Sequence, residues 1–392
     1  MRRTGISLGR LFGIRIRIDW SWLFIFALIT WNLVSVFGEL HPDWSTRLNL
    51  TIAIVGALLF FASVLAHELA HSLVAQAQGT GVDSITLFLF GGVSNIQEEP
   101  KSPQNEFLMA ILGPVTSIVI GGVLVTAASL LASPRVAFDA PPVDIMAQLG
   151  PVTTLLLWLG SVNIFLGIFN MIPGFPLDGG RVVRSILWAV TKDLRRATHW
   201  ASLLGQGVAW IMILAGIASA FGAQVPLIGA SFVGGLWLAF IGWFLSNAAT
   251  QSYRRVVVED ILDDVSVSRV MRSNPPVVSS DISLREFVEQ HVMQSDDYGF
   301  PVVDNDELRG IITLDDVRAV TRDEWDRTRV AQAMTPVDQV LTIAPDACAS
   351  EALEKLAHQD IRQLPVIREG DLVGLVRRQD IMRWLHFHSD AS

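Results

Sequence analysis

The stretch from Thr51 to Gln78, TIAIVGALLFFASVLAHELAHSLVAQAQ, decides the fold of this chain. Apolar residues run almost without interruption over residues 52–66, which is long enough with the following turns to cross a bilayer as a helix. The last third of the stretch contains His67, Glu68 and His71. Ionisable side chains at membrane depth are costly unless they are paired or bound to a metal, so this cluster predicts a functional site within the membrane.

The spacing of the two histidines indicates which chemistry to expect. Residues four apart stack on one face of a helix, so His67 and His71 can bind one metal ion together. Glu68 lies about 100° around the helix, near that ion but outside the pair of ligands. This is the H-E-x-x-H pattern of zinc hydrolases, in which the glutamate acts as general base. The alternative is a structural pair of histidines with Glu68 as counter-ion, which leaves the cost of burying three such groups in the membrane largely uncompensated.

Composition and charge divide the chain into two parts. The sequence is 51% hydrophobic and only 17% charged, which is typical of a membrane protein. Residues 1–255 hold 15 Lys and Arg against 12 Asp and Glu, whereas residues 256–392 hold 14 against 26. We therefore expect a membrane domain over residues 1–250, a linker over 251–259 and an acidic soluble domain over 260–392. An acidic domain is not expected to bind nucleic acid, and the single Cys348 excludes an internal disulfide.

Six apolar segments are long enough to be transmembrane helices: Trp20–Phe37, Leu50–Gln78, Phe107–Ala132, Val152–Met171, His199–Ala220 and Leu227–Asn247. Lys and Arg are concentrated before the first span and after the second, fourth and sixth, whereas the opposite loops hold only Arg47 and Arg135. By the positive-inside rule we expect a multi-pass protein of the cell (inner) membrane with both termini in the cytoplasm. His67 and His71 then lie in the cytoplasmic half of the second span.

Two short segments are typical of β-structure. Residues 14–18 alternate apolar and charged side chains, as in an amphipathic strand. Val82–Ile96 is β-rich and is interrupted by Gly91-Gly92, which predicts a membrane-associated hairpin because the segment is too short for another crossing. The edge of such a hairpin would accept an unwound substrate strand by β-augmentation, although a hairpin that merely caps the helices fits the sequence equally well.

A catalytic zinc site needs a third protein ligand and an open coordination position. The fourth span ends in NMIPGFPLDGGR, residues 170–181, where two prolines and three glycines break the helix. Asp178 is the only carboxylate between Asp144 and Asp193, and we expect it on a bent loop at the membrane level of His71. We therefore expect Asp178 to be the third ligand, the alternative being an ordinary turn aspartate before two glycines.

Taken together, His67-Glu68-Leu69-Ala70-His71 and Asn170-x-x-Pro173-x-x-Pro176-Leu177-Asp178-Gly179-Gly180 resemble the site-2 protease family of intramembrane zinc metalloproteases. The similarity extends over residues 1–250 and includes Gly113-Pro114 and Phe90-Gly91-Gly92. It implies a six-helix metalloprotease domain that binds one Zn²⁺ per chain. The implied zinc ligands are His67, His71 and Asp178, and Glu68 is the implied catalytic residue.

The resemblance also implies a substrate and a second catalytic group. The substrate would be a transmembrane segment of another membrane protein, locally unwound and cleaved in regulated intramembrane proteolysis. Asn170 would contact the oxyanion or the substrate backbone, and Asn163 is a weaker candidate for that role.

The acidic tail contains an internal repeat of about 64 residues, with copies at about 262–325 and 326–388. Residues 300–303, FPVV, correspond to 364–367, LPVI. The repeat resembles a tandem CBS-domain pair, a family in which a Thr/Ser-x-x-Asp element binds nucleotide. This implies an ATP or AMP site at Thr313 and Asp316 and, in the second copy, at Asp380, where Arg377 replaces the hydroxyl residue. A homodimer through the CBS domains is a further implication, and a pair without ligand is the alternative.

The expected fold class is an α-helical polytopic membrane protein with six transmembrane helices, a small membrane-associated β-hairpin or sheet and a C-terminal α/β tandem CBS domain. A CBS-regulated membrane channel or transporter is the alternative function. That alternative predicts transport without zinc and leaves the group His67, Glu68, His71 and Asp178 unexplained.

Overall fold

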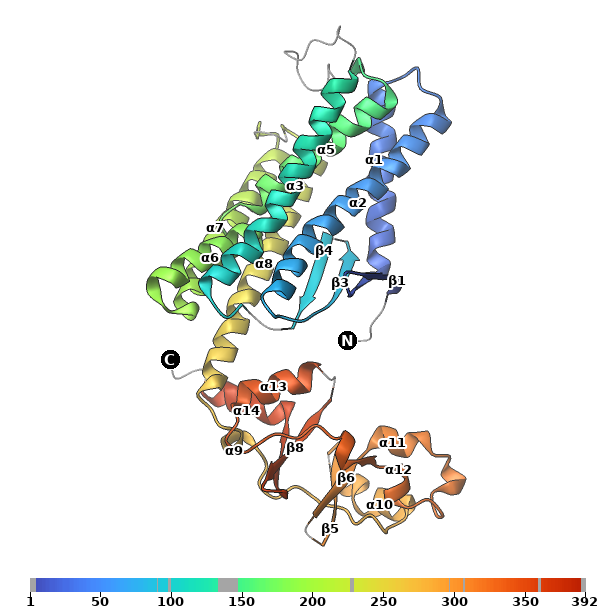
Figure 1. The fold of residues 1–392 in the computed structure, drawn as a ribbon, viewed down its shortest axis with the longest axis vertical. Helices are drawn as coiled ribbons and strands as arrows, with labels where there is room; N and C mark the ends of the chain where they lie inside the picture. Colours follow the sequence, from blue (N-terminus) through green and yellow to red (C-terminus); the bar gives the residue numbers. More distant parts are fainter. Residues whose placement is uncertain are drawn as a thin grey trace. The chain divides into compact units, whose positions relative to one another are not determined.

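The computed structural model describes residues 5–89, 91–97, 100–132, 147–225, 229–295, 297–305, 307–358 and 361–388 (Figure 1). Phe90, Arg135 and Asp144, which entered the sequence analysis, lie outside these ranges. The chain separates into two compact units at residue 254, and each is described by itself.

Within the described residues, six helices are long and apolar enough to cross a membrane, which confirms the prediction of six spans. They are α1 (Trp20–Leu40), α2 (Thr46–Ala77), α3 (Pro103–Leu131), α5 (Pro151–Asn170), α7 (Leu194–Ala220) and α8 (Phe232–Asp263). Local signals set their starts: the side chains of Asp19, Ser45 and Ser102 accept hydrogen bonds from the first turns of α1, α2 and α3. The predicted linker, residues 251–259, lies inside α8, so the connection to the second unit is helical.

One further helix, α6 (Asp178–Thr191), was not predicted. Asp178 is its first residue, so the expectation that Asp178 lies on a bent loop is wrong in this respect. The fourth span ends at Asn170, as the prolines and glycines predict, but Gly179 and Gly180 lie within a new helix, where they allow close packing. A Cβ on Gly179 would lie 2.3 Å from the carbonyl oxygen of Ile172, and one on Gly180 would lie 2.4 Å from the carbonyl carbon of Gly174. An aspartate in the first turn also favours helix formation because it faces the positive end of the helix dipole.

A four-stranded sheet packs beside the C-terminal half of α2 (Figure 1). It is formed by β1 (Ile6–Leu11), β2 (Ile14–Ile18), β3 (Val82–Phe88) and β4 (Gly91–Ile96), in that order, with β2 and β3 parallel and the other pairs antiparallel. The predicted hairpin and the predicted strand at residues 14–18 are thus parts of one sheet. Ile14, Ile16 and Ile85 are buried against Ala75 of α2 and Met109 of α3, which places the edge strand β4 at the level of the H-E-x-x-H sequence.

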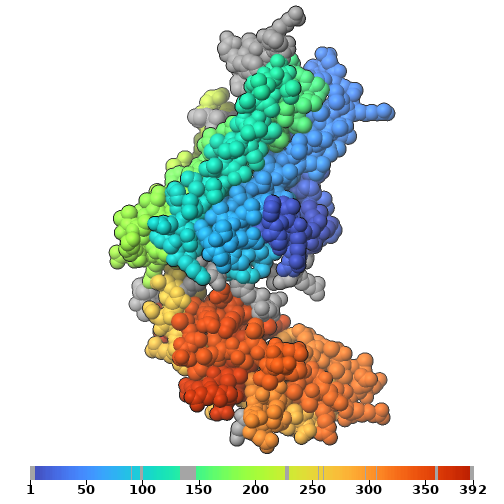
Figure 2. Space-filling view, viewed as in Figure 1, coloured from blue at the N-terminus to red at the C-terminus, as the bar shows by residue number. Residues whose placement is uncertain are grey.

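Helix α3 contacts most of the elements that build the site. It packs on α2, α5 and α6, and the space-filling view shows it in turquoise between α2 in blue and α6 and α7 in green (Figure 2). Its glycines let its neighbours approach: a Cβ on Gly121 would lie 2.6 Å from the Gly160 carbonyl oxygen of α5.

The second unit confirms the internal repeat. Its main sheet has the order β5 (Gly299–Asp304), β6 (Glu307–Thr313), β9 (Asp371–Arg377) and β8 (Gln363–Arg368), with β7 (Thr335–Pro336) paired to β6. Val302 pairs with Gly310 before a register shift, and Val366 pairs with Gly374 before the same shift one repeat later. The helices are α9 (Val267–Val270), α10 (Leu284–Gln290), α11 (Leu314–Ala319), α12 (Val330–Ala333), α13 (Ala349–His358) and α14 (Arg378–His388), with short 3₁₀ turns at Val292–Gln294, Arg322–Glu324 and Val337–Gln339.

The second unit has two apolar cores, and both copies of the repeat contribute to each. Val330 of the second copy is buried in the core of the first, and Val267 and Val270 of the first copy are buried in the core of the second. Leu284, Phe287 and Phe300 are fully buried in the first copy. Leu364, Val376 and Ile381 are fully buried in the second.

Candidate metal centre

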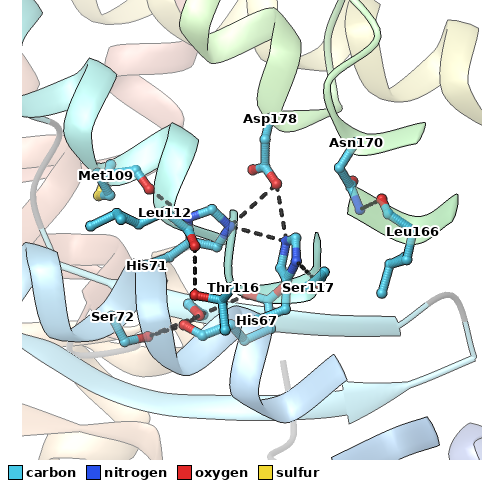
Figure 3. Close-up of polar contacts among 12 residues, drawn as sticks. His67, His71, Ser72, Met109, Leu112, Thr116, Ser117, Leu166, Asn170 and Asp178 are labelled. Carbon is cyan, nitrogen blue, oxygen red and sulfur yellow. Dashed lines mark hydrogen bonds and ion pairs between the residues drawn. The ribbon is translucent and has the colours of Figure 1, made fainter. Parts of the chain in front are cut away.

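Three side chains from two distant segments meet at one point (Figure 3). His67 Nε2 lies 3.0 Å from Asp178 Oδ2, His71 Nε2 lies 3.2 Å from the same oxygen, and the two Nε2 atoms are 3.2 Å apart. The histidines, on α2, are 4% and 5% exposed, and Asp178, at the start of α6, is half-buried. The structure thus brings together the three residues that the sequence singled out as metal ligands.

The donor set fits zinc. Two imidazole nitrogens and one carboxylate oxygen are donors that zinc takes in catalytic sites, and three protein ligands leave a fourth position for water. Ligand atoms at 2.0–2.1 Å from a tetrahedral ion are separated by roughly 3.3 Å. The observed separations of 3.0 to 3.2 Å are close to that value.

Residues of helix α3 contact the Nδ1 atoms of both imidazoles and orient the two rings. His71 Nδ1 lies 2.6 Å from the carbonyl oxygen of Met109, which can only accept, so this nitrogen donates and leaves Nε2 with a free lone pair. His67 Nδ1 lies 2.9 Å from Ser117 Oγ. Gly113 lies between these two contacts, and a Cβ there would be 2.1 Å from His71 Nε2. Met109 and Ser117 were not predicted from the sequence, although each lies four residues from Gly113, and this spacing is the available signal.

Glu68 lies outside the triangle of the three donor atoms, as its position on the helix predicts. Ser94 of β4 donates to Glu68 Oε2 at 2.9 Å, and Ser72 donates to the backbone oxygen of Glu68 at 2.9 Å. A Cβ on Gly92 would lie 2.4 Å from Glu68 Cγ. The carboxylate is therefore held between α2 and the edge strand of the sheet.

The two candidate asparagines are on α5. The side-chain amide of Asn170 donates to the Leu166 carbonyl oxygen at 3.0 Å, and Figure 3 shows it beside the donor triangle but turned toward its own helix. Asn163 is fully buried and donates to the Leu159 carbonyl oxygen at 2.8 Å. Its own Oδ1 has no hydrogen-bond partner among the described residues.

In the second unit, a cavity of about 1220 Å³ is lined by Thr313 and by three arginines, Arg362, Arg377 and Arg378. The Thr313 amide donates to Asp316 Oδ2 at 2.8 Å, and the Asp316 amide donates to Thr313 Oγ1 at 3.3 Å, which together form a capping box at the start of α11. The Thr313 hydroxyl also donates to Asp316 Oδ2, at 2.7 Å. Asp316 is therefore engaged with its own helix. It is not among the described residues that line the cavity.

The second copy differs from the first at the matching position. Asp380 accepts from Arg377 Nε at 2.7 Å and from Nη2 at 2.8 Å, and this pairing raises the pKa of Arg377. Arg377 also pairs with the buried Asp297, which accepts a second hydrogen bond from Arg272 at 2.9 Å. The Asp380 carboxylate is thus engaged in an ion pair with Arg377 of the same copy, and the sequence did not indicate this contact.

Tyr298, in the lining of this cavity, contacts residues of both copies. The Arg362 guanidinium lies 3.7 Å from the ring centroid of Tyr298. The Tyr298 hydroxyl donates to Asp315, and this hydrogen bond raises the pKa of Tyr298. The cavity lining thus carries three arginines, two aspartates (Asp297 and Asp315) and the Tyr298 ring.

The fold and the site together define a polytopic membrane protein with a metal-hydrolase donor set and a repeated α/β domain. The model of the family "Peptidase family M50" matches residues 55–214, and that of "CBS domain" matches 267–323 and 330–387. Rip3 of Mycobacterium tuberculosis, named as a zinc metalloprotease, is 33% identical over 383 residues, which are 97% of this chain and 93% of Rip3. The similarly named sll0528 of Synechocystis sp. is 32% identical over 386 residues, 97% of this chain and 96% of its own length.

A solved structure, the site-2 protease from Methanocaldococcus jannaschii, is 26% identical and covers 64% of this chain and 95% of its own, with a TM-score of 0.41. The full-length relatives show that this chain belongs to peptidase family M50, the site-2 protease type of zinc metalloprotease, and carries a C-terminal pair of CBS domains. The predicted resemblance is confirmed. This membership favours a protease over the channel or transporter alternative.

Proposed function

We propose that this multi-pass membrane metalloprotease cleaves a peptide bond within or near a transmembrane segment of a membrane-protein substrate. In this proposal His67, His71 and Asp178 hold the zinc ion that the family implies, and Glu68 is the catalytic base. The observation that carries the proposal is the triangle of donor atoms with separations of 3.0 to 3.2 Å, with Glu68 next to it on α2 but bonded elsewhere.

When bound at this site, zinc supplies a water molecule of lowered pKa and polarises the scissile carbonyl group. Glu68 takes a proton from the water as the new carbon–oxygen bond forms, and it returns a proton to the leaving amine as the carbon–nitrogen bond breaks. The hydrogen bond from Ser94 holds one oxygen of the carboxylate against β4. Asn170 would donate to the developing oxyanion after exchanging its bond to the Leu166 carbonyl for one to substrate.

The sheet indicates how the substrate would be presented. The carbonyl groups of an intact transmembrane helix are hydrogen-bonded, so the substrate must unwind before its carbonyl can be attacked. The edge strand β4 lies against Glu68 through Gly92 and Ser94, and an extended segment paired to it would run past the donor triangle. We therefore expect helix-breaking residues in the substrate near the scissile bond.

The distribution of charge supports an orientation. Lys and Arg are concentrated before α1 and after α2, α5 and α8, which supports a cell-membrane protein with both termini in the cytoplasm. The metal centre then lies in the cytoplasmic half of the membrane, the side from which water would enter.

The test compares the full-length protein with Glu68→Gln in metal content and in cleavage of a reconstituted membrane-protein substrate. We expect the variant to retain one zinc ion per chain and to lose cleavage by at least about 100-fold, because general acid–base catalysis contributes 10²–10⁴. Glu39→Gln, the same change at an exposed position in α1, is the control and should behave as wild type. Comparable cleavage in all three proteins would remove Glu68 from its role.

We further propose that the CBS pair binds an adenine nucleotide, ATP or AMP, and thereby modulates the protease. Arg362 and Arg378 in the lining of the cavity support an anionic ligand, and Thr313 lies in the same lining. Asp316 and Asp380 are the candidate ribose contacts, but each is engaged internally, so binding would have to compete with the Thr313 and Arg377 contacts.

Calorimetric titration of the full-length protein with ATP and AMP tests this. Binding is expected in wild type and should be weakened in Asp316→Ala and in Arg378→Ala. Arg383→Ala, on α14 outside the cavity lining, is the matched control. The absence of heat in wild type with both nucleotides would remove nucleotide sensing.

Association of two chains through their CBS domains belongs to the same proposal, and sedimentation with and without nucleotide measures it.

A further inference from the structure

A buried ion pair joins α3 to α6 outside the donor triangle. Arg184 Nε donates to Glu106 Oε1 at 2.6 Å, and Arg184 Nη2 lies 2.5 Å from the same oxygen. The Glu106 side chain is fully buried and that of Arg184 is 4% exposed. Burying two charges costs more than burying apolar side chains of similar size, so the position of this pair needs an explanation other than stability.

The two residues lie on the two elements that build the metal centre. Arg184 is on the helix that begins with Asp178, six residues or roughly 9 Å along its axis from that carboxylate. Glu106 is on α3, three residues before Met109, whose carbonyl oxygen orients His71. Glu106, Met109, Gly113 and Ser117 follow a spacing of three and four residues, so one face of α3 contacts both imidazoles and α6.

The segment that precedes α6 has no regular secondary structure that would fix the direction of that helix. Residues 171–177 are turns and bends between α5 and α6, and they bring Asp178 to the site at the end of an irregular segment. Arg184 also lies over the Phe175 ring, with 5.3 Å from the guanidinium carbon to the ring centroid. The same guanidinium thus contacts α3 on one side and the irregular segment on the other.

An ion pair fixes position more narrowly than apolar packing does. A guanidinium is a rigid fork, and here two of its nitrogens approach one carboxylate oxygen. If α6 rotated by one residue or slid by one turn, both buried charges would lose their partner, a strongly unfavourable state.

We propose that Glu106 and Arg184 are positioning residues for the metal centre: their ion pair sets α6 on α3 so that Asp178 Oδ2 reaches both imidazoles. The proposal rests on the proposed role of Asp178 as a zinc ligand. Neither residue contacts the donor atoms, so both act through the placement of a helix.

The test is the double variant Glu106→Gln/Arg184→Met in the purified full-length protein. Replacing both charges by neutral side chains of similar volume is expected to leave the melting temperature near or above that of wild type. The zinc dissociation constant is nevertheless expected to rise about 10- to 100-fold, the range for residues that orient metal ligands. The visible absorption of the cobalt-substituted protein should weaken in parallel, because that band reports the ligand geometry and not the activity.

Three further variants make the result decisive. Asn49→Ala removes a partly buried hydrogen bond from α2 to the Val34 carbonyl oxygen, about 27 Å along α2 from His67. This variant should lower the melting temperature but leave the zinc affinity and the cobalt spectrum unchanged. Asp178→Asn should lose the cobalt spectrum; if it does not, the proposed ligand set fails, whatever the ion pair does. If Asp178→Asn loses the spectrum and the double variant keeps wild-type zinc affinity, only the positioning role is overturned.

Arg184→Lys is the second variant if the double variant does not fold. It keeps the charge but loses the fork, and the zinc dissociation constant should rise by about tenfold. Wild-type zinc affinity and an unchanged cobalt spectrum in Arg184→Lys would also overturn the proposal.

Discussion

Gly113 of α3 offers the sharpest test of the metal centre, because a single added methyl group would collide with both imidazoles. In Gly113→Ala the new Cβ would lie 2.1 Å from His71 Nε2 and 2.8 Å from His67 Nε2. Ordinary contact begins at 3.4 Å, so His71 Nε2 has to retreat by about 1.3 Å. Metal–ligand distances tolerate only about 0.2 Å, so the retreat removes His71 from any shared ion.

The expected loss falls mainly on metal binding and not on folding. Overpacking a core costs about 1–3 kcal/mol, and replacing a helical glycine by alanine returns up to about 1 kcal/mol. The net change in the free energy of unfolding is therefore about 0–2 kcal/mol. Misplacing a reacting group by 1 Å costs about 100-fold, and we expect the zinc dissociation constant to rise by at least that factor, with cleavage falling as much or more.

The assay is competition between the detergent-solubilised protein and a chromophoric zinc chelator, with melting temperatures measured without metal. Gly122→Ala is the matched control, since it is the same change in the same helix at a glycine whose Cβ would meet nothing within 4 Å. It should bind zinc as wild type does and be slightly more stable. Wild-type zinc affinity in Gly113→Ala would show that the imidazoles do not sit against α3 in the working enzyme, and the geometry argued here would be wrong.

Ser117→Ala removes the partner of His67 Nδ1 and should weaken zinc binding about 10- to 100-fold. Thr116→Ala, whose hydroxyl donates to the Leu112 carbonyl oxygen of the same helix, should leave the zinc dissociation constant unchanged. Equal affinities in the two variants would count against the orienting contact. Gly92→Ala places a Cβ 2.4 Å from Glu68 Cγ and should abolish cleavage of a membrane substrate. The zinc content, measured by mass spectrometry, should stay at one ion per chain. Loss of the metal as well would contradict the separation of Glu68 from the zinc ligands.

The structure differs from the sequence prediction at Asp178, and it adds a strand pairing that the sequence did not predict. The loop expected at Asp178 is the first turn of α6, because Gly179 and Gly180 allow close packing against residues 171–175 rather than breaking the helix. The predicted strand at residues 14–18 and the predicted hairpin join into one sheet through the parallel pairing of β2 with β3. The strands β2 and β3 are separated by more than sixty residues of chain, and no local sequence pattern indicates which distant strands pair.

The sequence by itself determined the spans, the repeat and the residues that meet at the donor triangle. Apolar length sets a crossing, four-residue spacing sets a shared helical face, and a lone carboxylate left one candidate for the third ligand. Only the tertiary structure decided which distant residues support the site. Ser117, which contacts His67, is 50 residues away from it in the sequence, and Arg184, which pairs with Glu106, is 78 residues away from it. The physical reason is that a helix that is apolar all round buries no preferred face, so its contacts follow from packing against other helices and not from its own periodicity.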